Sequence, residues 1–185
     1  MREEYLEYSL WLLIIGSWVA GMAYGKWGGG ASGIFSEIGQ TVGLPPPVQL
    51  AWWQPLLYFP LTVLAAFILS QLFFGGGAII FIFSRGVIDS TLLENLENLL
   101  ARWNILTLEA ATIWTIFFII LVLAVNLPLC LWASHLGTKR SFRMLQRLRG
   151  NPLKPESGIW GGLLLLVTVS LVAGLIGSFA LSYAA

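Results

Sequence analysis

The amino-acid sequence predicts an all-α fold: a polytopic integral membrane helical bundle with four or five transmembrane helices and additional interfacial amphipathic helices. Of its 185 residues, 57% are hydrophobic and only 10% are charged, whereas an ordinary soluble domain carries about 25% charged residues. A small soluble fold leaves a large share of its surface in water, so it could not cover so much apolar surface. Lipid is the solvent that such a chain needs, and we expect residues 1–185 to form one membrane domain.

The first predicted span covers residues 7–25. The preceding residues are acidic, whereas a cleavable signal peptide starts with a basic stretch, so we expect this helix to be retained. At about 19 residues, its length is near the minimum that crosses a bilayer. Gly16 and Gly21 lie within it, and small residues let helices approach closely in lipid.

The second predicted span, residues 55–74, has about 20 residues and no charge. A connection rich in glycine and proline, residues 27–54, precedes it. Four apolar residues at helical spacing within that connection predict a short helix on the membrane surface. They are Ile34, Phe35, Ile38 and Val42.

A glycine triplet at residues 75–77 is expected to end the second span. The apolar stretch that follows, residues 78–91, is short and contains Arg85 and Asp89. It fits either a marginal helix packed inside the bundle or a re-entrant segment, because irregular backbone at membrane depth must be covered by protein or a wet cavity. Residues 92–106 have one leucine-rich face, which predicts a separate amphipathic helix at the interface.

The strongest predicted span is residues 110–134. It has about 25 residues, more than a bilayer needs, so it must tilt, kink or protrude. Pro128 lacks a backbone donor and is the expected kink site, and Asn126 could satisfy a freed backbone group. The last predicted span is residues 159–182.

The segment of residues 136–158 between these spans is strongly basic, and we expect it to be a cytoplasmic loop of a plasma or inner membrane protein. Short loops rich in lysine and arginine stay on the cytoplasmic side, where such side chains contact anionic lipid or a partner. Nucleic-acid binding is a weaker interpretation, and we expect no nucleic-acid partner. With four spans the N-terminus lies outside, and with five it lies inside. The basic residues are Lys139, Arg140, Arg143, Arg147, Arg149 and Lys154.

Six polar residues in or beside the predicted spans are candidates for buried or functional groups. Arg85 and Asp89 are four residues apart, so they can pair on a helix; we favour a position in water at the interface, the alternative being a purposeful pair within the bilayer. Glu109 could bind a cation or an arginine, or stabilise a helix N-terminus. Gln71 and Asn126 are expected to bond to neighbouring helices, as is Ser70.

The sequence offers little support for catalysis or a cofactor. Cys130 lies between two leucines and is expected to be an inert packed thiol. His135 is expected to lie at the interface or to bond a carbonyl at a helix end rather than bind a pigment or haem. Because we find no nucleophile–base pair, no HExxH motif and no paired carboxylates in a polar setting, we expect no enzyme, no metal and no cofactor.

Several segments together resemble the stage II sporulation protein M family of polytopic membrane proteins. They are the first helix SLWLLIIGSWVAGMAYG, the glycine-rich stretch FFGGGAIIFIFSRGVIDS and the segment NILTLEAATIW, in which Glu109 matches a glutamate that opens a long span. The His-Gly that commonly precedes that glutamate and the proline that follows it are absent here. The resemblance implies a non-enzymatic membrane component that assembles with other proteins, which in spore formers include cell-wall hydrolases.

The expected function is therefore a scaffold or assembly subunit of a larger membrane complex. Its partners would be membrane lipids and other membrane protein subunits, with further copies of the chain among the candidates. A second possibility is a permease-like or channel subunit served by a separate ATPase. A third is an accessory subunit of an energy-transducing or photosynthetic complex, in which tryptophan faces and His135 would contact pigment.

Overall fold

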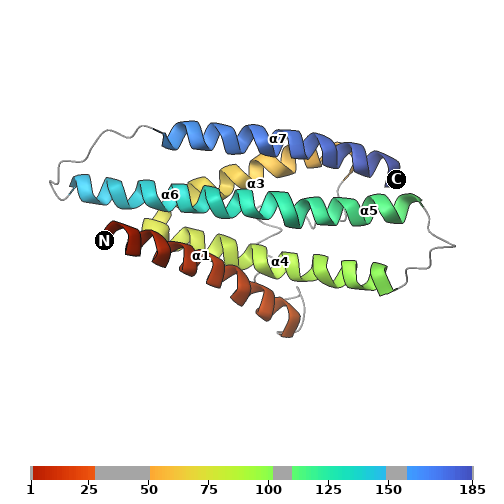
Figure 1. The fold of residues 1–185 in the computed structure, drawn as a ribbon, viewed down its shortest axis with the longest axis horizontal. Helices are drawn as coiled ribbons and strands as arrows, with labels where there is room; N and C mark the ends of the chain where they lie inside the picture. The colour runs from red at the N-terminus through yellow and green to blue at the C-terminus, as the bar shows by residue number, and fades with distance from the viewer. Residues whose placement is uncertain (1, 28–50, 102–109, 149–157, 185) are drawn as a thin grey trace.

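The computed structural model describes residues 2–27, 51–101, 110–148 and 158–184 (Figure 1). These residues are almost entirely helical and none of them forms a strand, so the predicted all-α fold is confirmed. The elements in chain order are α1 (Arg2–Trp27), α3 (Pro55–Leu69), the 3₁₀ turn η2 (Leu72–Gly75), α4 (Gly76–Ala101), α5 (Ala110–Leu121), the π-helical turn η3 (Val122–Asn126), α6 (Leu127–Leu148) and α7 (Ile159–Ala184).

Within the described residues, four helices are long and apolar enough to cross a membrane, which makes this a multi-pass membrane protein. The 15 residues of α3 are also apolar, but at 1.5 Å per residue they span about 22 Å, less than the roughly 30 Å of a hydrocarbon core. The predicted second span therefore ends as a helix at Leu69 and is completed by η2. The four long candidates are Tyr8–Trp27, Gly76–Ala101, Ala110–Leu145 and Ile159–Tyr183.

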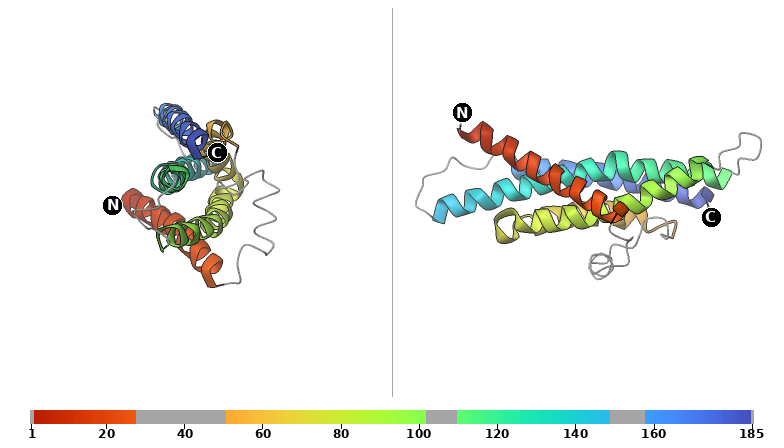
Figure 2. Two further views of the ribbon diagram at one scale, coloured as in Figure 1. Left: turned by 90° about the vertical axis from the view of Figure 1, so that its right-hand side faces the viewer. Right: turned by 90° about the horizontal axis from the view of Figure 1, so that it is seen from below.

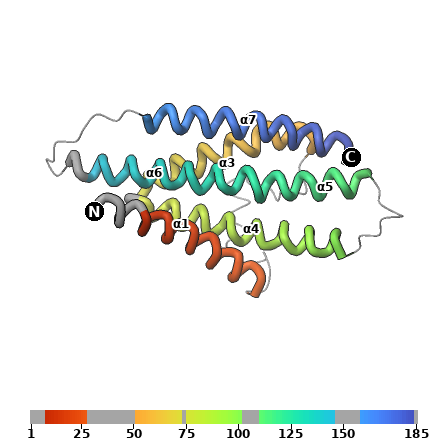
Figure 3. Tube along the Cα trace, in the orientation of Figure 1, coloured from red at the N-terminus to blue at the C-terminus, as the bar shows by residue number. Residues whose placement is uncertain are grey.

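The helices lie roughly along one axis and alternate in direction, as the trace in Figure 3 shows. The start of α1 and the end of α6 lie at one end of the bundle, and the end of α7 lies at the other (Figure 1). Helix α1 packs mainly against α4, while α3 packs against α6 and α7. The end-on view in Figure 2 shows α1 on the opposite side of the bundle from α7.

Helix α4 corrects the prediction for the middle of the chain. Residues 76–101 form one continuous helix. Of the two alternatives for residues 78–91, the helix packed inside the bundle is confirmed and the re-entrant segment is wrong, and residues 92–101 continue the same helix rather than form a separate interfacial one. The glycine triplet does not break the helix as a whole. Only Gly75, with a φ of 100°, adopts the left-handed conformation, and it ends η2. Gly76 and Gly77 already belong to α4, and Gly77 lies against the carbonyl of Leu69.

The long span differs from its prediction in two ways. Its helical path runs from Ala110 through η3 to Leu148, so residues 136–148 of the predicted basic loop belong to α6. Immediately before Pro128 the backbone forms the π-helical turn η3, and the N–H of Leu127 bonds to the carbonyl of Val122. Such a turn lets the helix continue past Pro128, whose nitrogen cannot donate a backbone hydrogen bond.

The packed interior consists of two apolar clusters. One joins α1, α3, α4, α6 and α7 around Val63, Ile82 and Leu166. The other lies around Phe59, Phe118 and Val122. Large apolar side chains of α7, such as Leu164 at 70% exposure, point outward, as expected of a surface that faces lipid.

The contact between α1 and α4 depends on small residues from both helices. A Cβ on Gly21 would meet the carbonyl of Phe83, and a Cβ on Gly86 would meet the carbonyl of Trp18. One turn further, Gly25 lies against the side chain of Ser90. The sequence therefore places small residues at Gly21 and Gly25, and at Gly86 and Ser90, where the two backbones come closest. Gly16, by contrast, has nothing within 4 Å of the Cβ position.

Candidate functional site

The most unusual group in the described interior is the ion pair between Arg85 and Asp89 of α4. Nε of Arg85 donates to Oδ1 of Asp89 at 2.9 Å, and both side chains are 0% exposed. The four-residue spacing predicts this pairing, since side chains at i and i+4 lie on one face of a helix. The favoured expectation that the two charges lie in water at the interface is wrong, because neighbouring helices cover them.

Two aromatic side chains from other helices add hydrogen bonds to the pair. Nε1 of Trp18 in α1 donates to Oδ2 of Asp89 at 3.0 Å. Nη1 of Arg85 donates to the hydroxyl of Tyr58 in α3 at 2.8 Å, and the guanidinium also lies 5.7 Å from the centre of the Tyr58 ring. These four residues, called the charge network below, connect α1, α3 and α4.

The helix contacts explain why the charge network forms here. Because Gly86 has no side chain, α1 comes close enough to α4 for its backbone at Trp18 to touch α4 beside Arg85. The Trp18 indole can then reach Asp89. Removing two charges from water costs several kcal/mol per ion, and only close pairing with further hydrogen bonds offsets that cost. Among the described residues, Nη2 of Arg85 is the one atom of this group that is buried without a partner.

A second polar cluster lies between α3 and the segment around η3. Nδ2 of Asn126 donates to Oγ1 of Thr62 at 3.1 Å, and Oγ1 of Thr62 donates to the carbonyl of Phe59 at 2.8 Å. The thiol of Cys130 donates weakly to Oδ1 of Asn126 at 3.4 Å. The two polar groups are adjacent along α3, because Tyr58 of the charge network directly precedes Phe59, whose carbonyl accepts the Thr62 bond.

For Asn126, the expected bond to a neighbouring helix is confirmed, while the suggestion that it satisfies a backbone group freed by Pro128 is not. Its partners are Thr62 and, at 3.5 Å, the carbonyl of Phe59. Ser70 and Gln71 differ from their prediction, because their side chains bond to carbonyls of Ala66 and Phe67 within their own segment. The backbone carbonyl of Gln71 instead accepts a bond from Ser141 of α6 at 3.0 Å.

Replacing Asn126 with leucine tests the second polar cluster. We expect the free energy of unfolding to fall by about 0.5–2 kcal/mol, because one interhelical bond is lost and the Thr62 hydroxyl loses a partner. Thermal unfolding in detergent measures the change. Combining it with Thr62→Val should cost less than the sum of the two single changes, and strict additivity would contradict the bond between them.

Of the other predicted candidates, Cys130 is buried as expected, whereas His135 is not at a helix end. The helix continues to Leu148, and the His135 ring stacks on Trp11 of α1 with centroids 4.6 Å apart. Arg140 lies over the ring of Trp160 at 4.3 Å, which ties the basic part of α6 to α7. Glu109, Arg149 and Lys154 lie outside the described residues, as do Ile34, Phe35, Ile38 and Val42, and the side chain of Arg147 is likewise not described.

The structure adds Trp18 and Tyr58 to the site. Sequence reasoning missed both, because 71 residues separate Trp18 from Asp89 and 27 separate Tyr58 from Arg85. The signal that could have indicated them is a buried charge pair's need for further hydrogen-bonding partners. Within residues 2–27, 51–101, 110–148 and 158–184, no three His, Cys, Asp or Glu side chains are grouped as metal ligands.

The four side chains of the charge network are hydrogen-bonded to one another. Its arginine and aspartate neutralise each other, and the indole and phenol occupy further bonding positions. Such an arrangement holds three helices in fixed register, because each bond fixes the distance between two helices. No protein-family model, curated protein or solved structure matches this chain.

Proposed function

We propose that the protein is a non-enzymatic assembly subunit of a larger membrane complex. The observation that carries this proposal is the charge network, in which Arg85 and Asp89 are wholly buried and are bonded by Trp18 and Tyr58 from two other helices. A membrane subunit that positions other proteins needs fixed helices. Buried charge pairs retained at a cost in stability serve in some proteins to specify one arrangement of helices.

The state of these charges favours assembly over transport. Charged residues that move ions or substrates through membranes face a water-filled cavity or exchange partners during transport. Here the arginine and aspartate face each other at 2.9 Å inside packed helices. A polar path through the bundle would need further side chains that face it, but the side chain of Gln71 bonds to its own segment. The resemblance to the stage II sporulation protein M family supports the same class of function.

Purification from the native membrane in mild detergent tests the proposal. We expect other membrane or membrane-associated chains to co-purify at a fixed stoichiometry, and mass spectrometry would identify them. The Asn98→Ala variant changes an exposed residue of α4, so it should retain the same partners. A protein that elutes alone, and that moves solutes when reconstituted in vesicles, would contradict assembly as its role.

We also propose that the basic end of α6 faces the cytoplasm of a cell whose plasma or inner membrane holds the protein. Lys139, Arg140 and Arg143 lie on the last turns of that helix, and positive residues beside a span stay on the cytoplasmic side. The start of α1 lies at the same end of the bundle (Figure 1), so the N-terminus would also face inside.

A cysteine at Met144, which is 46% exposed on α6, makes this orientation measurable. In a Cys130→Ser background, we expect a membrane-impermeant maleimide to label Met144→Cys only after the membrane is opened. A cysteine at exposed Tyr183, at the far end of the bundle, should be labelled in intact cells. The reverse pattern would contradict the proposed orientation.

One observation favours a second candidate, a permease-like or channel subunit. Nη2 of Arg85 is a buried donor with no bonding partner among the described residues, and a transported anion would satisfy it. This candidate requires an aqueous path to the charge network, whereas the assembly role requires that the network stay dry.

A further inference from the structure

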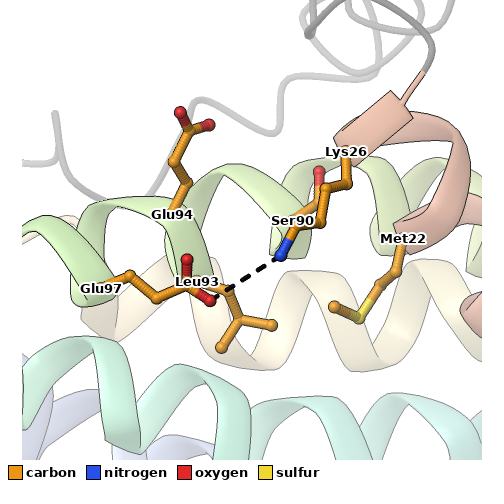
Figure 4. A pocket seen from close by; sticks show the side chains of 6 residues that line it. All are labelled: Met22, Lys26, Ser90, Leu93, Glu94 and Glu97. Carbon is orange, nitrogen blue, oxygen red and sulfur yellow. Dashed lines mark ion pairs between the residues drawn. The ribbon is translucent and has the colours of Figure 1, made fainter.

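A pocket lies between the end of α1 and the middle of α4, just beyond the charge network. It is lined by residues of both helices and has a volume of about 300 Å³. That volume is at the lower end of the range for small-ligand sites. Figure 4 shows Met22 and Lys26 approaching from α1 and the other side chains from α4. The lining residues are Met22, Lys26, Ser90, Leu93, Glu94 and Glu97.

The lengths of the apolar stretches of α1 and α4 indicate that the pocket lies at the level of a membrane surface. The apolar segment of α1 ends at Trp27, which is 81% exposed, and exposed tryptophans concentrate at the boundary between hydrocarbon and headgroups. On α4, the stretch from Gly76 to Leu93 is about 27 Å long, close to the thickness of the hydrocarbon core. The charged lining residues follow immediately after it.

The polar lining carries one cation and two carboxylates. Nζ of Lys26 lies 3.9 Å from Oε1 of Glu97, and these side chains are 67% and 68% exposed. Among the described residues, no ion pair involves Glu94. Oγ of Ser90 donates to the carbonyl of Val87 at 2.7 Å, so its oxygen can still accept a bond. Met22 and Leu93 give the pocket an apolar wall.

We propose that this pocket binds the headgroup of a phospholipid that carries a primary amine. The ammonium group would donate hydrogen bonds to the carboxylates of Glu94 and Glu97, while the phosphate would pair with Lys26. An acyl chain would lie against the apolar wall that Met22 and Leu93 form. A choline headgroup has no N–H to donate, and a glycerol headgroup lacks the cation that the two carboxylates require, so both fit less well.

Native mass spectrometry of the full chain in detergent, with added phosphatidylethanolamine, phosphatidylcholine or phosphatidylglycerol, tests the proposal. We expect retention of phosphatidylethanolamine to exceed that of either other lipid by about fivefold, the ratio that roughly 1 kcal/mol supplies. The double variant Glu94→Gln/Glu97→Gln should lose this preference. Asn95→Ala, at an exposed position outside the pocket lining, should keep it.

A second variant separates the two halves of the headgroup. Lys26→Gln should lower retention of phosphatidylethanolamine and phosphatidylcholine alike, because both carry the phosphate, while their ratio stays unchanged. Thermal unfolding should show that both variants fold as the unaltered protein does. Equal retention of the three lipids by the unaltered protein would overturn the proposal, as would a preference that survives in the double glutamine variant.

Discussion

Replacing Asp89 with asparagine is expected to lower the free energy of unfolding by about 3–5 kcal/mol, because it leaves a buried guanidinium without its counter-charge. Arg85 is 1% exposed and Asp89 is 0% exposed, so water cannot compensate for the lost carboxylate. The Trp18 indole also loses the charged oxygen to which it donates, and a neutral amide is a weaker acceptor. Reversible unfolding in mixed detergent micelles, followed by tryptophan fluorescence, measures the change.

Two comparisons identify the cause of that effect. The exposed pair of Lys26 and Glu97 provides the matched control, and Glu97→Gln should cost at most about 1 kcal/mol because water screens a surface ion pair. The double replacement Arg85→Met/Asp89→Leu should recover much of the loss, since apolar residues of similar volume need no counter-charge. An Asp89→Asn variant as stable as the unaltered protein would show that the two charges do not depend on each other.

Replacing Gly21 with leucine is the second change with a large expected effect. A side chain at this position would collide with the backbone of α4 at Phe83, and backbone cannot turn aside as a flexible side chain can. Helix α1 must therefore move away from α4, which also pulls Trp18 away from Asp89. We expect a loss of about 1–3 kcal/mol from overpacking, and more where the indole bond is broken as well.

Gly16 offers a control on the same helix. Nothing lies within 4 Å of its Cβ position, so Gly16→Leu should leave the free energy of unfolding unchanged or raise it slightly, since leucine favours a helix more than glycine does. Thermal unfolding of the two variants side by side makes the comparison. Equal effects at Gly16 and Gly21 would mean that close approach of α1 and α4 is not what Gly21 provides.

The sequence predicts most of the helical architecture because membrane spans have a strong local signal. Long apolar stretches mark the helices near Tyr8–Trp27, Ala110–Leu145 and Ile159–Tyr183 without knowledge of their neighbours. Helix α4 was harder to predict, because a glycine triplet and two charges suggested a break. Those features become compatible with a continuous helix only when other helices cover the charges, and that is tertiary information.

Part of the candidate site could also be predicted from local sequence, and part could not. The pairing of Arg85 with Asp89 follows from spacing along one helix, so it could be predicted. Its burial could not, because the covering residues Trp18 and Tyr58 come from distant parts of the chain. For Asn126, the sequence indicated a bond to another helix without identifying Thr62 as the partner.

The thiol of Cys130 reports directly on whether the polar interior is dry. It is fully buried and bonds to Asn126 in the polar cluster next to the charge network, and no substitution is needed to place it there. Labelling the unaltered protein in its membrane with a small, water-soluble, impermeant thiol reagent is therefore the most direct measurement. The assembly role predicts no modification of the folded protein and full modification once it is unfolded in detergent. Modification of the folded protein from either side of the membrane would reveal an aqueous path to the buried charges and would contradict that role.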